Sequence, residues 1–134
     1  MKILGIEHIG IALKSKKDKY FWDILLQETK KKIDIVKDQG VKTEIYDTKK
    51  GKVEFLDALD KNSVIAKFLD KRGPGIHHIS FEVENIKDAI DEMHQKGIDT
   101  VTESFTIGAE GFKVVFVHPM YTGGILVELT QRLA

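Results

Sequence analysis

An internal repeat constrains the fold of this chain more than any other feature of its sequence. The apolar run that follows His8 is echoed by a similar run after His78, and the run around Glu54 is echoed by the one around Glu128. The copies lie about 70 residues apart, a period too long for a solenoid repeat but suited to a duplicated half-domain. The repeat therefore predicts two similar halves, each of which contributes one histidine and one glutamate.

The first half is expected to fold as β-α-β-β-β. Its hydrophobic pattern predicts strands at 3–13, 32–37, 41–47 and 52–57. A helix is expected after Ser15, which has Asp18 three residues later in a weak capping-box pattern. The apolar positions of this helix have helical spacing and are expected to face a core: Tyr20, Phe21, Ile24 and Leu25.

The second half repeats this order after a short connector. Asn62 or Ser63 can cap a connecting helix, which the run 73–75 ends. Strands are predicted at 76–83, 98–103, 112–118 and 124–130, with a helix from an Asn85 cap to Gly97. The expected fold class is α+β. The whole chain 1–134 is expected to form one domain of two paired βαβββ modules, at about 3–59 and 76–131, joined by a helical connector at 60–75.

Strand alternation predicts where the repeated polar residues point. Neighbouring residues of a strand face opposite sides, so the apolar neighbours of Glu54 and Glu128 would pack on the two helices while the glutamates face away. If the halves form a curved, barrel-like mixed sheet, His8, Glu54, His78 and Glu128 converge in a cleft. His77 points to the opposite side from His78 and is not expected to join them.

Two imidazoles and two carboxylates form a mixed donor set that suits a borderline divalent metal. With two open coordination positions, such a site is typical of catalysis rather than of a closed structural role. A substrate carbonyl or enolate oxygen is the expected ligand there. The competing interpretation is that both histidines are ordinary interior residues and both glutamates lie at solvated strand ends.

Composition excludes several other classes of protein. The 134 residues include no cysteine, which removes disulfide and thiolate chemistry and agrees with a reducing, cytoplasmic location. The 21 acidic and 21 basic residues balance, which argues against a nucleic-acid partner. Since no apolar run approaches the length of a membrane span, no membrane partner is expected either.

Four stretches resemble the vicinal oxygen chelate superfamily, and within it the methylmalonyl-CoA epimerases most of all. They are Ile6–Ala12, Ser63–Leu69, Gly75–Val83 and His118–Leu129. The resemblance implies His8, Glu54, His78 and Glu128 as ligands of one divalent ion, such as Co, Ni, Mn or Zn. It also implies a homodimer and a small acyl-CoA thioester as the substrate.

The same resemblance implies a reaction that inverts the carbon next to a thioester carbonyl through a metal-stabilised enolate. Such an epimerisation needs two proton-transfer groups. Glu128 takes the place of one family carboxylate, and Asp38 stands where the family carries a glutamate. Two alternatives stay open: glyoxalase I (lactoylglutathione lyase), with a similar ligand quartet, and a metal-free binding or resistance protein of the same fold.

Overall fold

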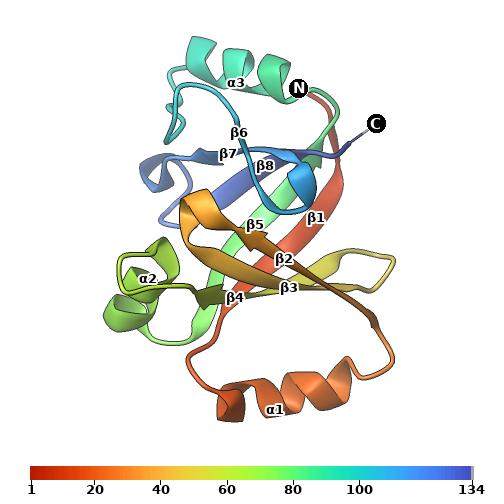
Figure 1. The fold of residues 1–134 in the computed structure, drawn as a ribbon. Coiled ribbons are helices and arrows are strands. Elements are labelled where there is room, and N and C mark those ends of the chain that lie inside the picture. Colours follow the sequence, from red (N-terminus) through yellow and green to blue (C-terminus); the bar gives the residue numbers. More distant parts are fainter. Residues whose placement is uncertain (134) are drawn as a thin grey trace. The chain divides into compact units, whose positions relative to one another are not determined.

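The computed structural model describes residues 1–133 (Figure 1). The β-α-β-β-β order occurs twice, with a helix between the two copies, and confirms the expected α+β fold class. The elements are β1 (Ile3–Ala12), α1 (Lys16–Leu25), β2 (Lys30–Val36), η1 (Lys37–Gln39), β3 (Val41–Asp47), β4 (Lys52–Ala58), α2 (Val64–Arg72), β5 (Gly75–Val83), α3 (Ile86–Gln95), β6 (Thr106–Ile107), η2 (Ala109–Gly111), β7 (Lys113–Val117), η3 (Pro119–Tyr121) and β8 (Val127–Gln131).

The chain divides into two compact units whose boundaries cut through β1 and β5. One unit, named here the His8 unit, contains residues 1–8 and the chain from His78 onward. The other, named here the Glu54 unit, is the continuous segment Ile9–His77. The assignment of all residues to a single domain stays a prediction. Among residues 1–133, no helix is both long and apolar enough to span a membrane.

The His8 unit places its strands in the order β1-β5-β8-β7-β6. β5 and β8 run parallel, so Ser80 lies opposite Glu128, while β7 and β8 run antiparallel, so Phe116 also lies opposite Glu128. Residues paired across strands share a face of the sheet. One face of this unit therefore carries His78 and Ser80 from β5, Phe116 from β7, and Glu128 and Thr130 from β8.

The other face of the same strands forms an apolar core with α3. Asn85 caps this helix by accepting a hydrogen bond from the backbone N–H of Asp88, as the sequence predicts. α3 contacts β7 and β8, and Figure 1 shows the helix lying next to these strands. The buried side chains are Val83, Ile86, Ala89, Ile90, Met93, Val115, Val117 and Leu129. His78, Ser80, Glu128 and Thr130 lie on the opposite face, away from α3.

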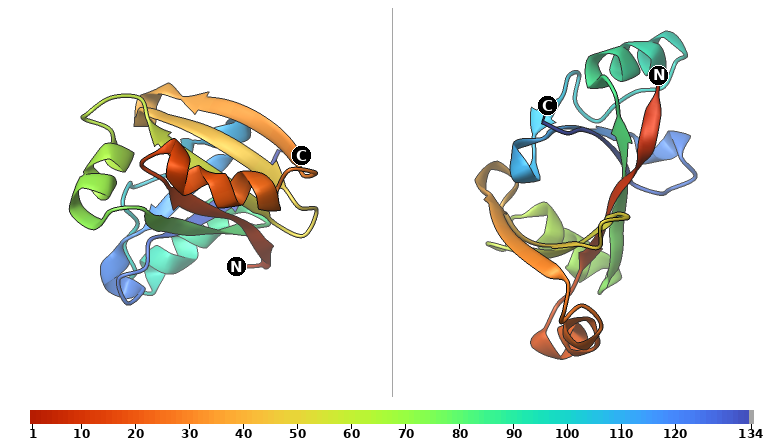
Figure 2. Two further views of the ribbon diagram at one scale, coloured as in Figure 1. Left: turned by 90° about the horizontal axis from the view of Figure 1, so that it is seen from below. Right: turned by 90° about the vertical axis from the view of Figure 1, so that its right-hand side faces the viewer.

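The Glu54 unit forms an antiparallel arrangement of β2, β3 and β4, and the end of β1 lies next to β4. Ser63 caps α2 and accepts a hydrogen bond from the backbone N–H of Ala66. Two apolar clusters hold the unit together, one around Phe55 and Tyr46 and one around Leu56 and Ile65. α1 contributes to the first of them, and Figure 2 shows this helix alongside the strands.

The expectation that the apolar stripe of α1 faces a core is wrong. Its four members are exposed: Tyr20, Phe21, Ile24 and Leu25. The buried side of the helix passes instead through Lys19 and Trp22 and continues to Leu26 beyond its end. The Lys19 ammonium lies 4.6 Å from the Phe55 ring centroid and 2.7 Å from Glu44. The buried side of the helix therefore includes a lysine paired with Glu44, whereas the hydrophobic pattern predicted only apolar residues there.

The predicted strand at 98–103 is also wrong. That segment makes a single isolated bridge, Thr100 with Val117, and the short strand β6 lies further along. The Thr100 hydroxyl donates to the carbonyl of Thr102, and the Thr102 hydroxyl donates to that of Ser104. Such local side-chain bonds compete with a strand ladder, and here they hold the chain in a series of bends.

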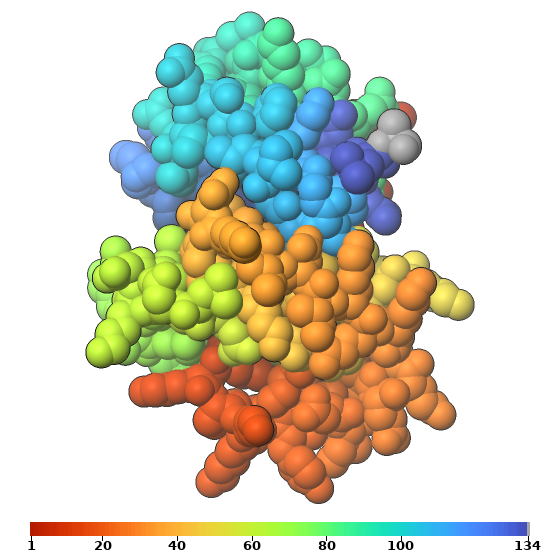
Figure 3. Space-filling model, viewed as in Figure 1, coloured from red at the N-terminus to blue at the C-terminus, as the bar shows by residue number. Residues whose placement is uncertain are grey.

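A tight turn fixes the segment that contains Asp38. Gly40 follows η1 with φ of 64°, a left-handed conformation that favours glycine. A Cβ atom on Gly40 would lie 3.0 Å from the Cβ of Ser63, and the Gly40 carbonyl accepts a bond from the Leu59 N–H. The β2–η1 segment is orange and on the surface in Figure 3, in line with the exposed Asp38 side chain.

Candidate metal centre

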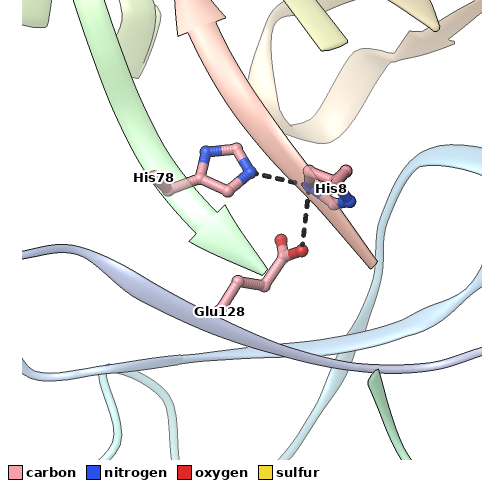
Figure 4. A group of neighbouring side chains, drawn as sticks. All are labelled: His8, His78 and Glu128. Atoms are coloured by element: carbon pink, nitrogen blue, oxygen red, sulfur yellow. Dashed lines mark hydrogen bonds and ion pairs between the residues drawn. The ribbon is translucent and has the colours of Figure 1, made fainter. Parts of the chain in front are cut away.

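Two histidines from neighbouring strands of the His8 unit face each other in its interior (Figure 4). The Nε2 atoms of His8 and His78 lie 2.8 Å apart, and both side chains are buried. Their rings are nearly perpendicular, and the ring of Phe116 packs edge-on against His78. The two ring nitrogens thus face each other at hydrogen-bonding distance, and the aromatic neighbour limits rotation of His78.

The carboxylate of Glu128 completes this group. Its Oε1 atom lies 3.4 Å from Nε2 of His8 (Figure 4). Burial raises the pKa of the Glu128 carboxyl, whereas the nearby imidazole of His8 and the hydroxyls of Ser80 and Thr130 act in the opposite direction. The three residues therefore bring two imidazoles and one carboxylate together in a buried part of the unit.

A pair of buried hydroxyls supports Glu128. The Thr130 hydroxyl donates to Oε1 of Glu128 at 2.9 Å, and the Ser80 and Thr130 hydroxyl oxygens lie 2.6 Å apart. Since a hydroxyl has one hydrogen to donate, Ser80 donates to Thr130 when Thr130 donates to Glu128. These two linked hydrogen bonds hold the carboxylate of Glu128 in place. The sequence signal was a polar residue two positions after each of His78 and Glu128, and therefore on the same face of its strand.

Sequence reasoning also missed Glu7. This side chain is buried, and its Oε1 atom lies 2.9 Å from Nδ1 of His8. Its other oxygen lies 3.8 Å from Nε of Arg132, which follows β8. Strand alternation predicts that neighbouring residues point apart, so it gave no reason to join Glu7 to His8.

The donor set of His8, His78 and Glu128 fits a divalent metal ion. One ligand atom from each residue lies within 4.8 Å of the other two. The two Nε2 atoms lie 2.8 Å apart, close enough for one ion with metal–nitrogen bonds of about 2.1 Å to be bound by both. Imidazole and carboxylate donors also suit ions such as zinc, nickel and cobalt.

The two other predicted site residues belong to the Glu54 unit. Glu54 is buried in β4, on the side of the strand opposite to Phe55. Asp38 is exposed in η1. Their roles as ligand and base stay predictions.

The three remaining histidines make other contacts. His77 packs its ring against Phe68, and burial together with the positive charge of Arg72 lowers its pKa to about 4. His94 is exposed and contacts the Thr100 hydroxyl. His118 is exposed and caps η3 by accepting a hydrogen bond from the N–H of Met120. Of the adjacent pair, therefore, only His78 joins the buried group of His8 and Glu128.

The sequence also identifies the family of the chain. Residues 7–116 match the Glyoxalase/Bleomycin resistance protein/Dioxygenase superfamily. The chain belongs to this superfamily. The matched segment includes His8 and His78, whereas Glu128 lies beyond its end.

Individual relatives narrow the comparison. The human protein named methylmalonyl-CoA epimerase, mitochondrial, is 35% identical over 129 residues, which cover 94% of this chain and 73% of the human one. A solved structure named methylmalonyl-CoA epimerase from Mycobacterium tuberculosis has a TM-score of 0.89 at 29% identity, over 98% of this chain and 90% of that one. A hypothetical protein from Bacillus halodurans C-125 has a TM-score of 0.88 at 35% identity, over 96% and 94%. These matches confirm the expected glyoxalase-like fold and the resemblance to the epimerases.

Proposed function

We propose that this chain is an isomerase that epimerises methylmalonyl-CoA, or a similar acyl-CoA thioester, with the help of one divalent metal ion. The buried convergence of His8, His78 and Glu128 carries this proposal, because it unites two imidazole nitrogen donors with a carboxylate. The similarity to proteins named methylmalonyl-CoA epimerase supports the substrate class.

Each group of the His8 unit has a chemical task in this reaction. His8 and His78 would hold a divalent ion through Nε2, and Glu128 would hold it through a carboxylate oxygen. A bound divalent ion supplies positive charge, which favours an enolate over the neutral thioester. Glu128 removes or returns the proton of the substrate carbon on one face. The hydroxyls of Thr130 and Ser80 keep its carboxylate oriented for that transfer.

The Glu54 unit supplies the remaining proposed groups. Epimerisation needs a second proton-transfer group for the opposite face of the carbon, and we assign this role to Asp38. Asp38 lies in a turn before Gly40. The epimerases that the sequence resembles carry a glutamate at this position, which supports the assignment. Glu54 is the fourth proposed ligand, and its burial in β4 supports a role for the carboxylate in the interior.

Two assays separate this function from its alternatives. The protein is stripped of metal with a chelator, reloaded with Co, Ni, Mn or Zn, and given one stereoisomer of methylmalonyl-CoA. Formation of the other isomer only after reloading supports the proposal. Thioester formation from methylglyoxal and glutathione, without epimerisation, would indicate glyoxalase I instead. A purified protein that retains no metal and shows neither activity would favour a binding protein.

The proposal includes a homodimer, which the resemblance implies. Four exposed apolar side chains on α1 support an assembly that covers them: Tyr20, Phe21, Ile24 and Leu25. Light scattering coupled to size-exclusion chromatography tests this directly, because a monomer has a mass of 15.2 kDa. Replacement of Phe21 by a charged residue, as in Phe21→Glu, is expected to shift a dimer towards that mass.

A further inference from the structure

Glu7 is a buried acid whose position in β1 is unusual. It precedes His8, so simple strand alternation would send the two side chains to opposite sides. Instead they are in contact, with 2.9 Å between Oε1 of Glu7 and Nδ1 of His8. Only 4% of Glu7 is exposed. Burial of a carboxylate is costly unless it is paired, so its partners explain why it is there.

The partners of Glu7 impose a direction on the hydrogen bond. An ionised carboxylate can only accept, so Nδ1 of His8 must carry the hydrogen. Arg132 lies 3.8 Å from the second oxygen of Glu7, and its guanidinium lies 5.6 Å from the Phe112 ring centroid. The guanidinium therefore places a positive charge beside the carboxylate of Glu7.

A neutral imidazole with its hydrogen on Nδ1 has its lone pair on Nε2. That nitrogen is the one that lies 2.8 Å from His78 and 3.4 Å from Glu128. We propose that Glu7 is a positioning residue, which holds His8 in the tautomer that presents the Nε2 lone pair to a divalent cation. Arg132 supports Glu7 from the other side.

This inference rests on the metal site proposed above, but one readout is independent of metal. Long-range proton–nitrogen NMR of metal-free protein, with ¹⁵N-labelled histidine, reports which ring nitrogen carries the hydrogen. His8 is assigned by comparison with His8→Gln. The expected result for the parent is a protonated Nδ1 and an unprotonated Nε2. A His8 ring protonated on Nε2 would overturn the inference without any variant of Glu7.

The second readout is the affinity for Zn²⁺ or Co²⁺, measured by competition with a chromophoric chelator. Glu7→Gln can present either an oxygen or an NH₂ group to His8, so it no longer selects one tautomer. The expected loss of affinity is about 10- to 100-fold, as for other outer partners of metal-binding histidines. Glu7→Asp keeps the charge and is expected to restore part of the loss. The visible spectrum of the Co²⁺ form is expected to change in Glu7→Gln.

Glu44→Gln is the matched control, because it removes a paired carboxylate in the Glu54 unit. It is expected to lower stability while leaving the His8 signals and metal affinity unchanged. If Glu7→Gln behaves like this control, Glu7 is only a structural residue and the inference fails. If Glu7→Gln does not fold, the NMR spectrum of the parent and the metal affinity of Glu7→Asp test the inference instead. Failure of the parent to bind metal, with His8 protonated on Nδ1, would contradict the proposed function and leave the role of Glu7 in tautomer selection intact.

Discussion

The Nε2 atoms of His8 and His78 lie 2.8 Å apart although 70 residues separate them in the sequence. Removal of either ring, in His8→Ala or His78→Ala, is predicted to lower the affinity for a divalent ion by more than about 100-fold. Loss of a residue that only hydrogen-bonds to a metal ligand costs about 10- to 100-fold. Isothermal titration with Zn²⁺ or Co²⁺ checks this. Both variants are expected to fold, because the core under α3 does not include these rings. Unchanged affinity in both would exclude them as ligands.

The hydroxyl chain behind Glu128 is predicted to be energetically coupled. Thr130→Val removes the donor to Glu128 and the acceptor for Ser80, which should lower the free energy of unfolding by about 1–3 kcal/mol. Ser80→Ala should cost less in the Thr130→Val background than in the parent, with a coupling of about 0.5–3 kcal/mol. Urea denaturation of the four metal-free proteins measures this cycle. Strictly additive losses would show that the two hydroxyls act separately.

Asp38 is predicted to serve one face of the substrate carbon. Asp38→Asn should slow epimerisation by about 100-fold or more, the order of effect expected for a proton-transfer group. It should spare exchange of the proton that Glu128 serves. Asp38→Glu should keep substantial activity, since it restores the longer carboxylate of the family pattern. Asp57→Asn, which changes an exposed carboxylate of β4, is the control and should behave like the parent. Normal epimerisation by Asp38→Asn would reduce Asp38 to a turn residue.

The Lys19–Glu44 pair is predicted to make stability depend on pH. Burial alone would raise the Glu44 pKa, but the hydrogen bond and charge of Lys19, with a contribution from Lys31, hold it below 4.5. Between the lowered pKa of Glu44 in the folded protein and 4.5, the unfolded chain therefore binds more protons than the folded one. The stabilisation from Glu44 is complete above about pH 4.5 and is lost as the pH falls through the pKa of the folded protein.

Lys19 has the opposite dependence on pH. Burial alone would lower its pKa, but the hydrogen bonds and charge of its partners raise it above 10.5, so its stabilisation is lost only as pH rises beyond that value. Glu44→Gln should lose on the order of 1 kcal/mol at neutral pH. Urea midpoints measured across the acid range should fall less steeply for this variant than for the parent. Parallel profiles would show that the pair does not contribute.

The sequence repeat predicted the strands that carry His8, His78 and Glu128, because two-residue alternation and burial on one face are local properties. It could not predict which side of α1 is buried, since helical spacing defines a stripe but not its partner. Lys19 enters that interface only because Glu44 and the ring of Phe55 meet it there. Glu7 was missed for a related reason. Its contact with His8 departs from the simple alternation of a strand. Its other neighbour, Arg132, is far away in the sequence, so no local pattern connects the two residues.

The segment after α3 shows a different limit. Thr100 and Thr102 have the β-branched character of strand residues, yet their hydroxyls bond to nearby carbonyls. Similarly, β8 begins at Val127 rather than at Gly124, which has φ of 89° and donates its N–H to the Pro119 carbonyl. In both places local hydrogen bonds, which hydrophobic patterns do not report, set where the ladder begins.

The proposed chemistry is tested most directly by exchange of the α-proton of methylmalonyl-CoA in deuterated water. Metal-stripped protein is predicted to incorporate little deuterium, and reloading with a divalent ion should restore incorporation at the carbon next to the thioester. The same reloading should fail to restore it in His78→Ala. Equal incorporation with and without metal would contradict metal dependence. No incorporation by fully loaded parent protein would contradict proton abstraction from this substrate altogether.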